Sequence, residues 1–386
     1  MSNQFSPWPS FSEEEADIVK NILLSNKVNY WTGTECRDFE NEFANWSDSK
    51  YAVALSNGTV ALDAALNALD IKEGDEVIVT SRSYIASVTS IVNSNATPIF
   101  ADVDLDTQNI TYKSINSVIT NKTKAILCVH LAGWPCDMDE IMSLANQHNL
   151  FVIEDCSQAH GAKYKGKSVG SIGHIGCWSF CQDKIITTGG EGGMVTTNNK
   201  VFWKKMWEYK DHGKSYEAVY NQIYSQGFRW LHESFGTNGR MTEIQASIGR
   251  FQLKRMQDWH KKRLNNANTI WNAAKHCKLF RVPVIPNHIE HAAYKCYVFV
   301  EGSAELRDKL LMQINEKGVP CYSGSCSEIY LEKAFDNSDI RPNYRLPNAK
   351  VLGETSLMFL VHPTLTKKEI QKTCDVLIDV AVSNYG

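Results

Sequence analysis

Seven short runs rich in β-branched and apolar residues alternate with helical stretches over the first two-thirds of the chain, and this alternation limits the fold more than any other feature. It is typical of a largely parallel sheet that is covered by helices. The sequence therefore predicts an α/β fold. The predicted strands are YAVAL (51–55), EVIVTS (76–81), TPIFAD (97–102), KAILCVH (124–130), LFVIED (150–155), GCWSF (176–180) and GMVTT (193–197).

Helices are predicted between these strands over residues 60–69, 85–95 and 138–149, with Asp137 or Asp139 capping the last one. From about residue 238 to 276, a long helical segment is expected to cross to a second unit. That unit contains a strand-like run, KCYVFVEG, and two amphipathic helices, AELRDKLLMQINEKG and KKEIQKTCDVLIDVAVSN. We predict a large domain over residues 1–255. A long connecting helix and a small α+β domain follow over residues 256–386.

Polar residues follow several of the predicted strands. In open α/β sheets, ligands bind beyond the carboxyl ends of the strands. Packing alone does not explain why polar residues collect at these positions, so the sequence predicts a binding site at this edge. The residues are Ser56, Asn57, Gly58 and Thr59 after the first strand, His130 after the fourth, and Glu154 and Asp155 at the end of the fifth.

Lys184 has unusual neighbours for a lysine. In WSFCQDKIITTGGEGG it lies between apolar residues and a run containing four glycines, which let the backbone approach another group closely. Most lysines occupy solvated surfaces. An amine that is held among apolar neighbours can instead act as a nucleophile toward a carbonyl group. The pattern makes Lys184 a candidate for covalent chemistry.

Asp155 lies at the end of a buried strand, about 30 residues before Lys184. It has two interpretations. It could cap a helix or a turn, or it could be the counter-ion of a protonated ring nitrogen in a cofactor that Lys184 holds as a Schiff base. The turn after the first strand, SNGT, precedes a helix and could bind the phosphate of such a cofactor, although ordinary caps use the same residues. Ser179 could add a hydroxyl, and Tyr84 is either an aromatic contact or core packing.

The composition excludes several classes of function. A net charge of −3 with only short basic runs does not indicate a nucleic-acid partner. The 11 cysteines form no CxxC pair and lie largely in or beside apolar runs, so no metal site is predicted. The amino terminus does not resemble a signal peptide, and no apolar run approaches the length of a membrane span. We therefore expect a reduced, cytoplasmic protein without a membrane partner.

An ordered set of segments resembles the DegT-type sugar aminotransferases, which are fold-type-I pyridoxal phosphate enzymes. The segments are GDEVIVTSRSYIAS, FADVD, HLAGWPCDMD, EDCSQAHGAKYKGKSVGSIGHIGCWSF, Lys184 and GGEGGMVTTN. The resemblance implies an aspartate-aminotransferase-like fold with a mostly parallel seven-stranded sheet. It implies that Lys184 holds pyridoxal 5'-phosphate, that Asp155 pairs with the pyridine nitrogen, and that Gln158 contacts the side of the ring that carries the hydroxyl.

The same resemblance assigns the remaining cofactor contacts. Gly58, Thr59 and Ser179 would hold the phosphate, and Tyr84 would stack on the ring. The segment FGTNGRMTEIQASIG is similar to the family segment in which an asparagine, here Asn238, reaches the cofactor phosphate of the other subunit. That implies a homodimer with shared active sites. Cys156, Ser157 and residues 181–183 depart from the family pattern without disturbing these assignments.

The resemblance also implies the reaction. We expect an amino group to pass from L-glutamate to a keto group, at C4, of a nucleotide-linked 4-keto-6-deoxy sugar, for amino-sugar, O-antigen or other glycan biosynthesis. Within the family, the lysine favours transamination over the dehydration that a histidine branch performs. A UDP-linked 2-acetamido-4-keto sugar is the first expectation, followed by dTDP- and GDP-linked sugars. Amination at C3, a pyridoxal phosphate enzyme without transamination, and a non-catalytic regulator are the alternatives. Arg240, His160, His212 and His362 are weaker candidates for substrate contacts.

Overall fold

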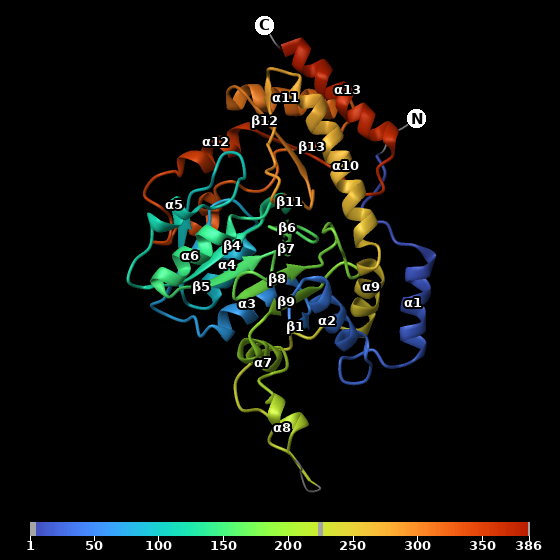
Figure 1. The fold of residues 1–386 in the computed structure, drawn as a ribbon, viewed down its shortest axis with the longest axis vertical. Coiled ribbons are helices and arrows are strands. Elements are labelled where there is room, and N and C mark those ends of the chain that lie inside the picture. Colours follow the sequence, from blue (N-terminus) through green and yellow to red (C-terminus); the bar gives the residue numbers. More distant parts are fainter. Residues whose placement is uncertain (1–4, 223–226, 385–386) are drawn as a thin grey trace.

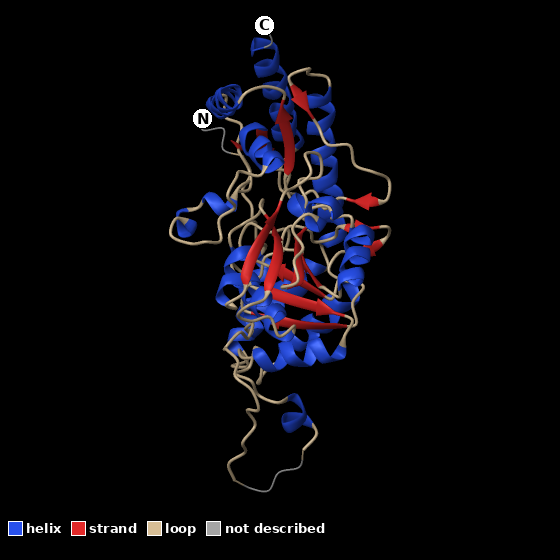
Figure 2. Ribbon diagram, turned by 90° about the vertical axis from the view of Figure 1, so that its left-hand side faces the viewer, coloured by secondary structure: helices blue, strands red, loops and turns tan. Residues whose placement is uncertain are grey.

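The fold is described from a computed structural model over residues 5–222 and 227–384. A seven-stranded sheet forms the centre of the larger unit (Figures 1 and 2), with the strand order β1-β9-β8-β5-β4-β2-β3. Only β9 runs against the other strands. The mostly parallel sheet is confirmed, and each predicted strand agrees with an observed one to within one residue at either end. The strands are β1 Tyr51–Leu55, β2 Glu76–Thr80, β3 Thr97–Ala101, β4 Thr123–Val129, β5 Phe151–Asp155, β8 Ile175–Ser179 and β9 Gly193–Thr197.

Helices cover both faces of this sheet because its side chains alternate between two cores. Along β1, Val53 and Leu55 belong to one buried cluster with α3, whereas Ala52 and Ala54 belong to a second cluster with α2. The strands are apolar on both faces for that reason. The helices of this unit are α1 Glu13–Leu24, α2 Glu35–Trp46, α3 Gly58–Ala68, α4 Ala86–Asn93, α5 Tyr112–Asn116, α6 Met138–His148, α7 Lys200–Tyr209, α8 Tyr216–Tyr220 and α9 Glu243–Leu253.

A second, antiparallel sheet lies in the C-terminal unit, above the large sheet in Figure 1, with the order β10-β12-β14-β13. It packs with three helices around its own buried core. The predicted division of the chain at residue 255 stays a prediction. The elements are α10 Met256–Lys275, β10 Phe280–Arg281, β12 Cys296–Val300, α11 Ala304–Glu316, β13 Cys321–Tyr322, α12 Pro347–Thr355, β14 Ser356–Phe359 and α13 Lys367–Asn384.

The two units are joined by more than the connecting helix. A small sheet pairs β11 (Ile289–Glu290) with β6 (Lys163–Tyr164), which in turn pairs with β7 (Lys167–Ser168). Tyr330 packs edge-on against Phe100 of β3, with ring centroids 5.4 Å apart. These contacts fix the loops of the C-terminal unit above the carboxyl edge of the large sheet.

Two predictions about helices were wrong in detail. The helical segment expected from residue 238 begins only at Glu243, because Thr242 caps α9 through the amide of Gln245, and Asn238, Arg240 and Thr242 each form a backbone bridge instead. It is also interrupted at Lys254 and Arg255, between α9 and α10. Asp137 occupies the position before α6 but does not cap it, since its carboxylate accepts a hydrogen bond from the Tyr164 hydroxyl at 2.6 Å.

Across residues 5–222 and 227–384, no helix combines the length and the apolar character that crossing a membrane requires.

Candidate active site

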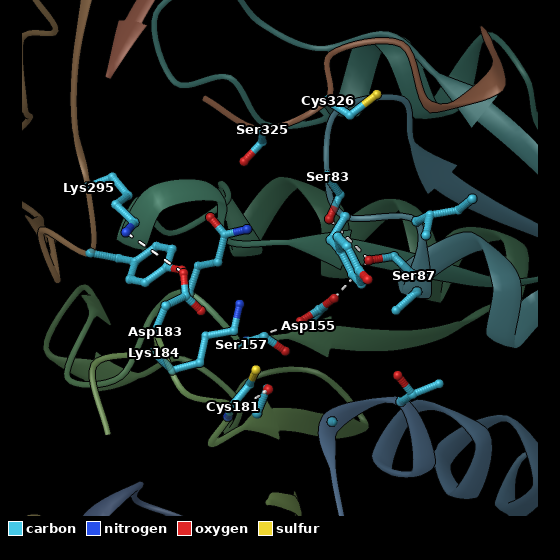
Figure 3. A pocket seen from close by; sticks show the side chains of 18 of the residues that line it. Ser83, Ser87, Asp155, Ser157, Cys181, Asp183, Lys184, Lys295, Ser325 and Cys326 are labelled. Carbon is cyan, nitrogen blue, oxygen red and sulfur yellow. Dashed lines mark hydrogen bonds and ion pairs between the residues drawn. The ribbon is translucent and has the colours of Figure 1, made fainter. Parts of the chain in front are cut away.

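A cavity of about 990 Å³ opens between the carboxyl ends of the parallel strands and the loops of the C-terminal unit (Figure 3). Seven of the eight predicted site residues line it. They come from four separate segments of the large unit, which the sheet topology brings to one edge. The seven are Gly58, Thr59, Tyr84, Asp155, Gln158, Ser179 and Lys184.

The turn between β1 and α3 packs tightly against the end of β8. A Cβ atom on Gly58 would lie 2.6 Å from the Cβ atom of Ser179, so a larger residue would push the two segments apart. Asn57 caps α3 by accepting a hydrogen bond from the amide of Val60 at 2.9 Å. The first amides of α3 and the Ser179 hydroxyl therefore adjoin one another at the cavity wall. Such a helix start attracts an anion.

Asp155 ends β5 and is 5% exposed. Its carboxylate accepts hydrogen bonds from the Ser87 hydroxyl at 2.9 Å and from the amide of Ser157 at 3.0 Å. The hydrogen bond from the Ser157 amide is what the first interpretation of Asp155, as the cap of a turn, requires. No ion pair of the described residues involves Asp155, and a buried carboxylate without a cation is costly. A cationic group bound in the cavity would compensate it.

Lys184 follows β8, and contacts with Trp8 and the burial of the next two residues hold its backbone in place. Its carbonyl accepts a hydrogen bond from the Trp8 indole at 2.9 Å, while Ile185 and Ile186 are fully buried. The amine projects into the cavity and lies 5.3 Å from the ring centroid of Tyr294 (Figure 3). The apolar neighbours seen in the sequence thus anchor the backbone and leave the amine free to react.

Gln158 and Tyr84 lie on other parts of the cavity wall. The side-chain oxygen of Gln158 accepts a hydrogen bond from the amide of Ala132 at 2.9 Å, which leaves its NH₂ group as a donor. Tyr84 is 70% exposed, so it is not the core residue that the alternative interpretation required. The roles of both residues toward a cofactor stay predictions.

Asn238 does not line the cavity of its own chain. It is exposed and pairs with Asp211 in a backbone bridge. The weaker candidates also lie elsewhere. His160 is buried against Trp178 and Phe180, Arg240 pairs with Asp211, His212 is exposed, and His362 is bonded to Thr364.

Sequence reasoning missed the part of the wall that the C-terminal unit provides. Tyr294 and Lys295 precede β12, Tyr322 belongs to β13, Met358 and Leu360 lie in and just after β14, and the others follow β13. The sequence gives no local signal for them, because only the packing of the second unit brings them to the wall of this cavity. The loop residues are Gly324, Ser325, Cys326, Ile329 and Glu332.

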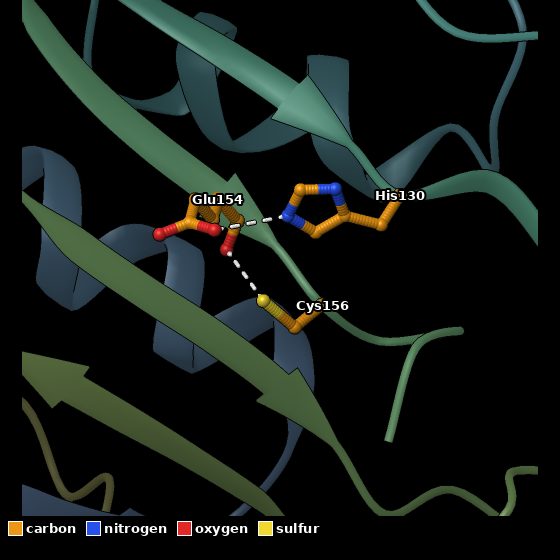
Figure 4. A group of neighbouring side chains, drawn as sticks. All are labelled: His130, Glu154 and Cys156. Carbon is orange, nitrogen blue, oxygen red and sulfur yellow. Dashed lines mark hydrogen bonds and ion pairs between the residues drawn. The ribbon is translucent and has the colours of Figure 1, made fainter. Parts of the chain in front are cut away.

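A second polar group, at the ends of β4 and β5, does not line the cavity (Figure 4). Glu154 is fully buried and accepts hydrogen bonds from His130 Nε2 at 3.1 Å and from three amides of the loop before β8. Nδ1 of His130 accepts a hydrogen bond from the Cys136 amide, so Nε2 carries the proton that is donated to Glu154. Glu154, His130 and Cys156 lie close enough to share a metal ion. Because the Glu154 oxygens are already engaged, we describe the group as a hydrogen-bond network that ties the loop to β5.

Comparisons of the chain with a family model, with curated proteins and with solved structures all point to aminotransferases. The model of the DegT/DnrJ/EryC1/StrS aminotransferase family matches residues 9–378. GDP-perosamine synthase of Escherichia coli O157:H7 is 38% identical over 381 residues, 95% of each chain. The dTDP-3-amino-3,6-dideoxy-alpha-D-galactopyranose transaminase of Aneurinibacillus thermoaerophilus is 32% identical over 380 residues, 97% of this chain and 96% of its own. The X-ray structure of the aminotransferase from Psychrobacter cryohalolentis superimposes with a TM-score of 0.97 at 62% identity, over 99% and 100% of the two chains.

The family implies pyridoxal phosphate as the cofactor, and the cavity fits it. The start of α3 with Ser179 suits a phosphate, uncompensated Asp155 suits a protonated ring nitrogen, and the amine of Lys184 suits an aldehyde. These three features occur together in one cavity. The fit therefore rests on the geometry as well as on the family.

We expect borohydride reduction of the protein loaded with pyridoxal phosphate to fix a pyridoxyl group on Lys184, because its amine projects into the cavity. Peptide mapping by mass spectrometry would locate the group. Lys184→Ala should carry none, whereas the matched variant Lys317→Ala, at an exposed lysine, should be labelled like the wild type. A pyridoxyl group on another lysine would contradict the assignment.

Glu154→Gln should lower the free energy of unfolding by about 1–3 kcal/mol, because the amide would turn an N–H donor toward backbone amides that need an acceptor. Urea denaturation of the cofactor-loaded protein would measure this change. Glu73→Gln, at an exposed position, is the control and should leave the free energy of unfolding unchanged. Equal denaturation midpoints for the two variants would show that the network does not stabilise the fold.

Proposed function

The chain belongs to the DegT/DnrJ/EryC1/StrS aminotransferase family, and on this premise we propose that it transfers the amino group of L-glutamate to C4 of a nucleotide-linked 4-keto-6-deoxy sugar. The observation that carries the proposal is the meeting of Lys184, Asp155 and the start of α3 in one cavity. Similarity to a GDP-perosamine synthase supports a nucleotide sugar as the acceptor and C4 as the position. The product would serve amino-sugar and polysaccharide biosynthesis.

Each residue of the large unit has a defined task in this proposal. When bound, pyridoxal phosphate accepts the electron pair that remains when the donor loses its Cα proton. Lys184 Nζ holds the cofactor and, once released, moves that proton. Asp155 keeps the ring nitrogen protonated. Gly58, Thr59 and Ser179 bind the phosphate.

The remaining cavity residues orient the cofactor ring. The NH₂ group of Gln158, whose side-chain oxygen is taken by the Ala132 amide, would donate to the ring hydroxyl, and Tyr84 on the cavity wall would contact the ring. Because one cavity receives the amino donor and the sugar in turn, the two substrates react in separate half-reactions.

Amination at C3 is the second candidate, and one similarity favours it. The Aneurinibacillus relative is named for a 3-amino product. The position that reacts depends on which carbon of the sugar faces Lys184. That orientation is fixed by contacts with the sugar, and part of the cavity wall belongs to the C-terminal unit.

We also propose a homodimer in which each chain completes the other chain's site. Asn238 is exposed, outside its own cavity, and follows a segment with three strongly exposed aromatic side chains. Exposed apolar side chains gathered in one segment favour contact with another protein surface. They are Phe228, Trp230 and Phe235, at 78%, 81% and 100% exposure.

The acceptor is tested by incubating the enzyme with glutamate and a panel of UDP-, dTDP- and GDP-linked 3-keto and 4-keto sugars. We expect one 4-keto sugar to be aminated at C4, and NMR of the product would locate the nitrogen. Lys184→Ala is the control without a reactive amine. Amination only at C3 would exclude the C4 proposal, and no turnover of any sugar would exclude the substrate class.

The shared site is tested by mixing Lys184→Ala with Asn238→Ala chains. Each heterodimer would contain one site with both residues intact, so complete exchange of equal amounts should restore about a quarter of wild-type activity. The control is each variant alone under the same exchange conditions. Activity that stays at the mean of the two variants, after mass spectrometry has verified exchange, would show that the sites are not shared.

A further inference from the structure

The cavity wall carries few positive charges. Among the described residues that line it, Lys184 and Lys295 are the only lysines, and the wall contains no arginine or histidine. In the proposed function, on which this inference rests, Lys184 binds the cofactor. Lys295 is therefore the cation on this wall that remains for an anionic group of a substrate.

Lys295 lies close to the reacting amine. Its Nζ atom is 4.7 Å from the ring centroid of Tyr294, and Nζ of Lys184 is 5.3 Å from the same point, so the amines are within about 10 Å of each other. Figure 3 shows Lys295, Asp183 and Lys184 on one side of the cavity, with Ser83, Ser87 and Cys326 on the other. An amino acid with two carboxylates can span this interval, with its amine near Lys184 and a carboxylate near Lys295.

The ammonium group of Lys295 is held in place but retains free donors. Its nearest carboxylate oxygen, on Asp183, lies 3.8 Å away, which is longer than a hydrogen bond. Asp183 itself accepts a hydrogen bond from the Tyr294 hydroxyl. Burial raises the pKa of Asp183, but Lys184, Tyr294 and Lys295 outweigh burial and hold it below its usual range. Asp183 thus stays ionised and steadies Lys295 without using up its donors.

The surroundings of Lys295 carry an excess of positive charge. Arg263 is 1% exposed, and its Nε and Nη2 atoms have no hydrogen-bond partner, while Nη1 donates to the carbonyl of Tyr294 at 3.4 Å. Asp183 is the carboxylate that faces Arg263, Lys184 and Lys295 together. A bound anion would offset this imbalance.

We propose that Lys295 binds a carboxylate of the amino donor, with Asp183 and Tyr294 as positioning residues. The diphosphate of the sugar nucleotide is also anionic, but the burial of Lys295 favours the smaller group. The Lys295 side chain is only 16% exposed, and its amine lies over the same Tyr294 ring as the amine of Lys184. The exposed part of the wall, with Tyr84 and Tyr322, offers more room for a nucleotide.

The first test measures binding of glutarate, a dicarboxylate without an amino group, to the cofactor-loaded enzyme by calorimetry. Lys295→Met keeps the length of the side chain but removes its charge and should weaken binding roughly 10- to 100-fold, the usual effect of losing a charged hydrogen bond. Lys295→Arg should restore most of the affinity. Lys317→Met, at an exposed lysine that pairs with Asp379, is the control and should bind like the wild type.

The second test separates the two possible anions by following each half-reaction in a single turnover. Lys295→Met should raise the glutamate concentration that gives half the maximal rate of the first half-reaction. The nucleotide-sugar concentration that gives half the maximal rate of the second half-reaction should stay unchanged. A loss confined to the sugar half-reaction, or unchanged binding of both substrates, would overturn the inference. Failure of the wild type to react with glutamate would instead overturn the proposed function.

Glutarate binding should also depend on pH. Burial lowers the pKa of Lys295 to about 8, with Asp183 opposing the shift and Arg263 and Lys184 adding to it. His362 also faces this group, and burial with the charges of Arg263 and Lys295 lowers its pKa to about 3, so it is neutral in this range. Affinity should fall as the pH rises through about 8, because the ammonium loses its charge. In Lys295→Arg the decline should be absent, and an identical decline in that variant would contradict the assignment.

Discussion

The position of the site depends on how closely the β1–α3 turn approaches the ends of β8 and β9. A Cβ atom on Gly193 would lie 2.3 Å from the carbonyl oxygen of Asn57, and one on Gly58 would lie 2.6 Å from Cβ of Ser179. Glycine at both positions lets three chain segments meet. Because the meeting brings the start of α3 beside Ser179, the same close packing that joins strands distant in sequence also forms the wall to which we assign the phosphate. The glycine run after Lys184 is explained in part by this approach.

Two adjacent carboxylates on β5 divide structural and chemical tasks between them. Glu154 points into the protein, where backbone amides and His130 fill its oxygens. Asp155 faces the cavity and is held by Ser87 and Ser157. The alternation of side chains along a strand places neighbours on opposite sides. The anchored residue fixes the strand end, and the next residue can then hold an uncompensated charge toward a ligand.

The sequence predicted all seven strands of the large sheet because they are apolar on both faces and form continuous β-branched runs. It also singled out Lys184 and Asp155, whose local neighbours are unusual for their residue types and which the structure places in one cavity, while their roles stay predictions. It did not identify Lys295, because a lysine before a strand looks like any surface lysine until the second unit is packed above the sheet. The capping role of Asp137 was wrong for a similar reason, since the competing partner Tyr164 comes from a distant segment.

Both units contribute residues to the cavity wall, and the two sets of residues differ in kind. The large unit supplies the turn between β1 and α3, Asp155 and Lys184, to which we assign the cofactor contacts in the proposed function. The C-terminal unit supplies Tyr294, Lys295, Tyr322 and the loop of Ser325 and Cys326. A substitution in the C-terminal part of the wall would leave the residues that the large unit contributes in place. Since the β12–β14 sheet holds these loops through its own core, the choice of substrate can vary while the central sheet stays the same.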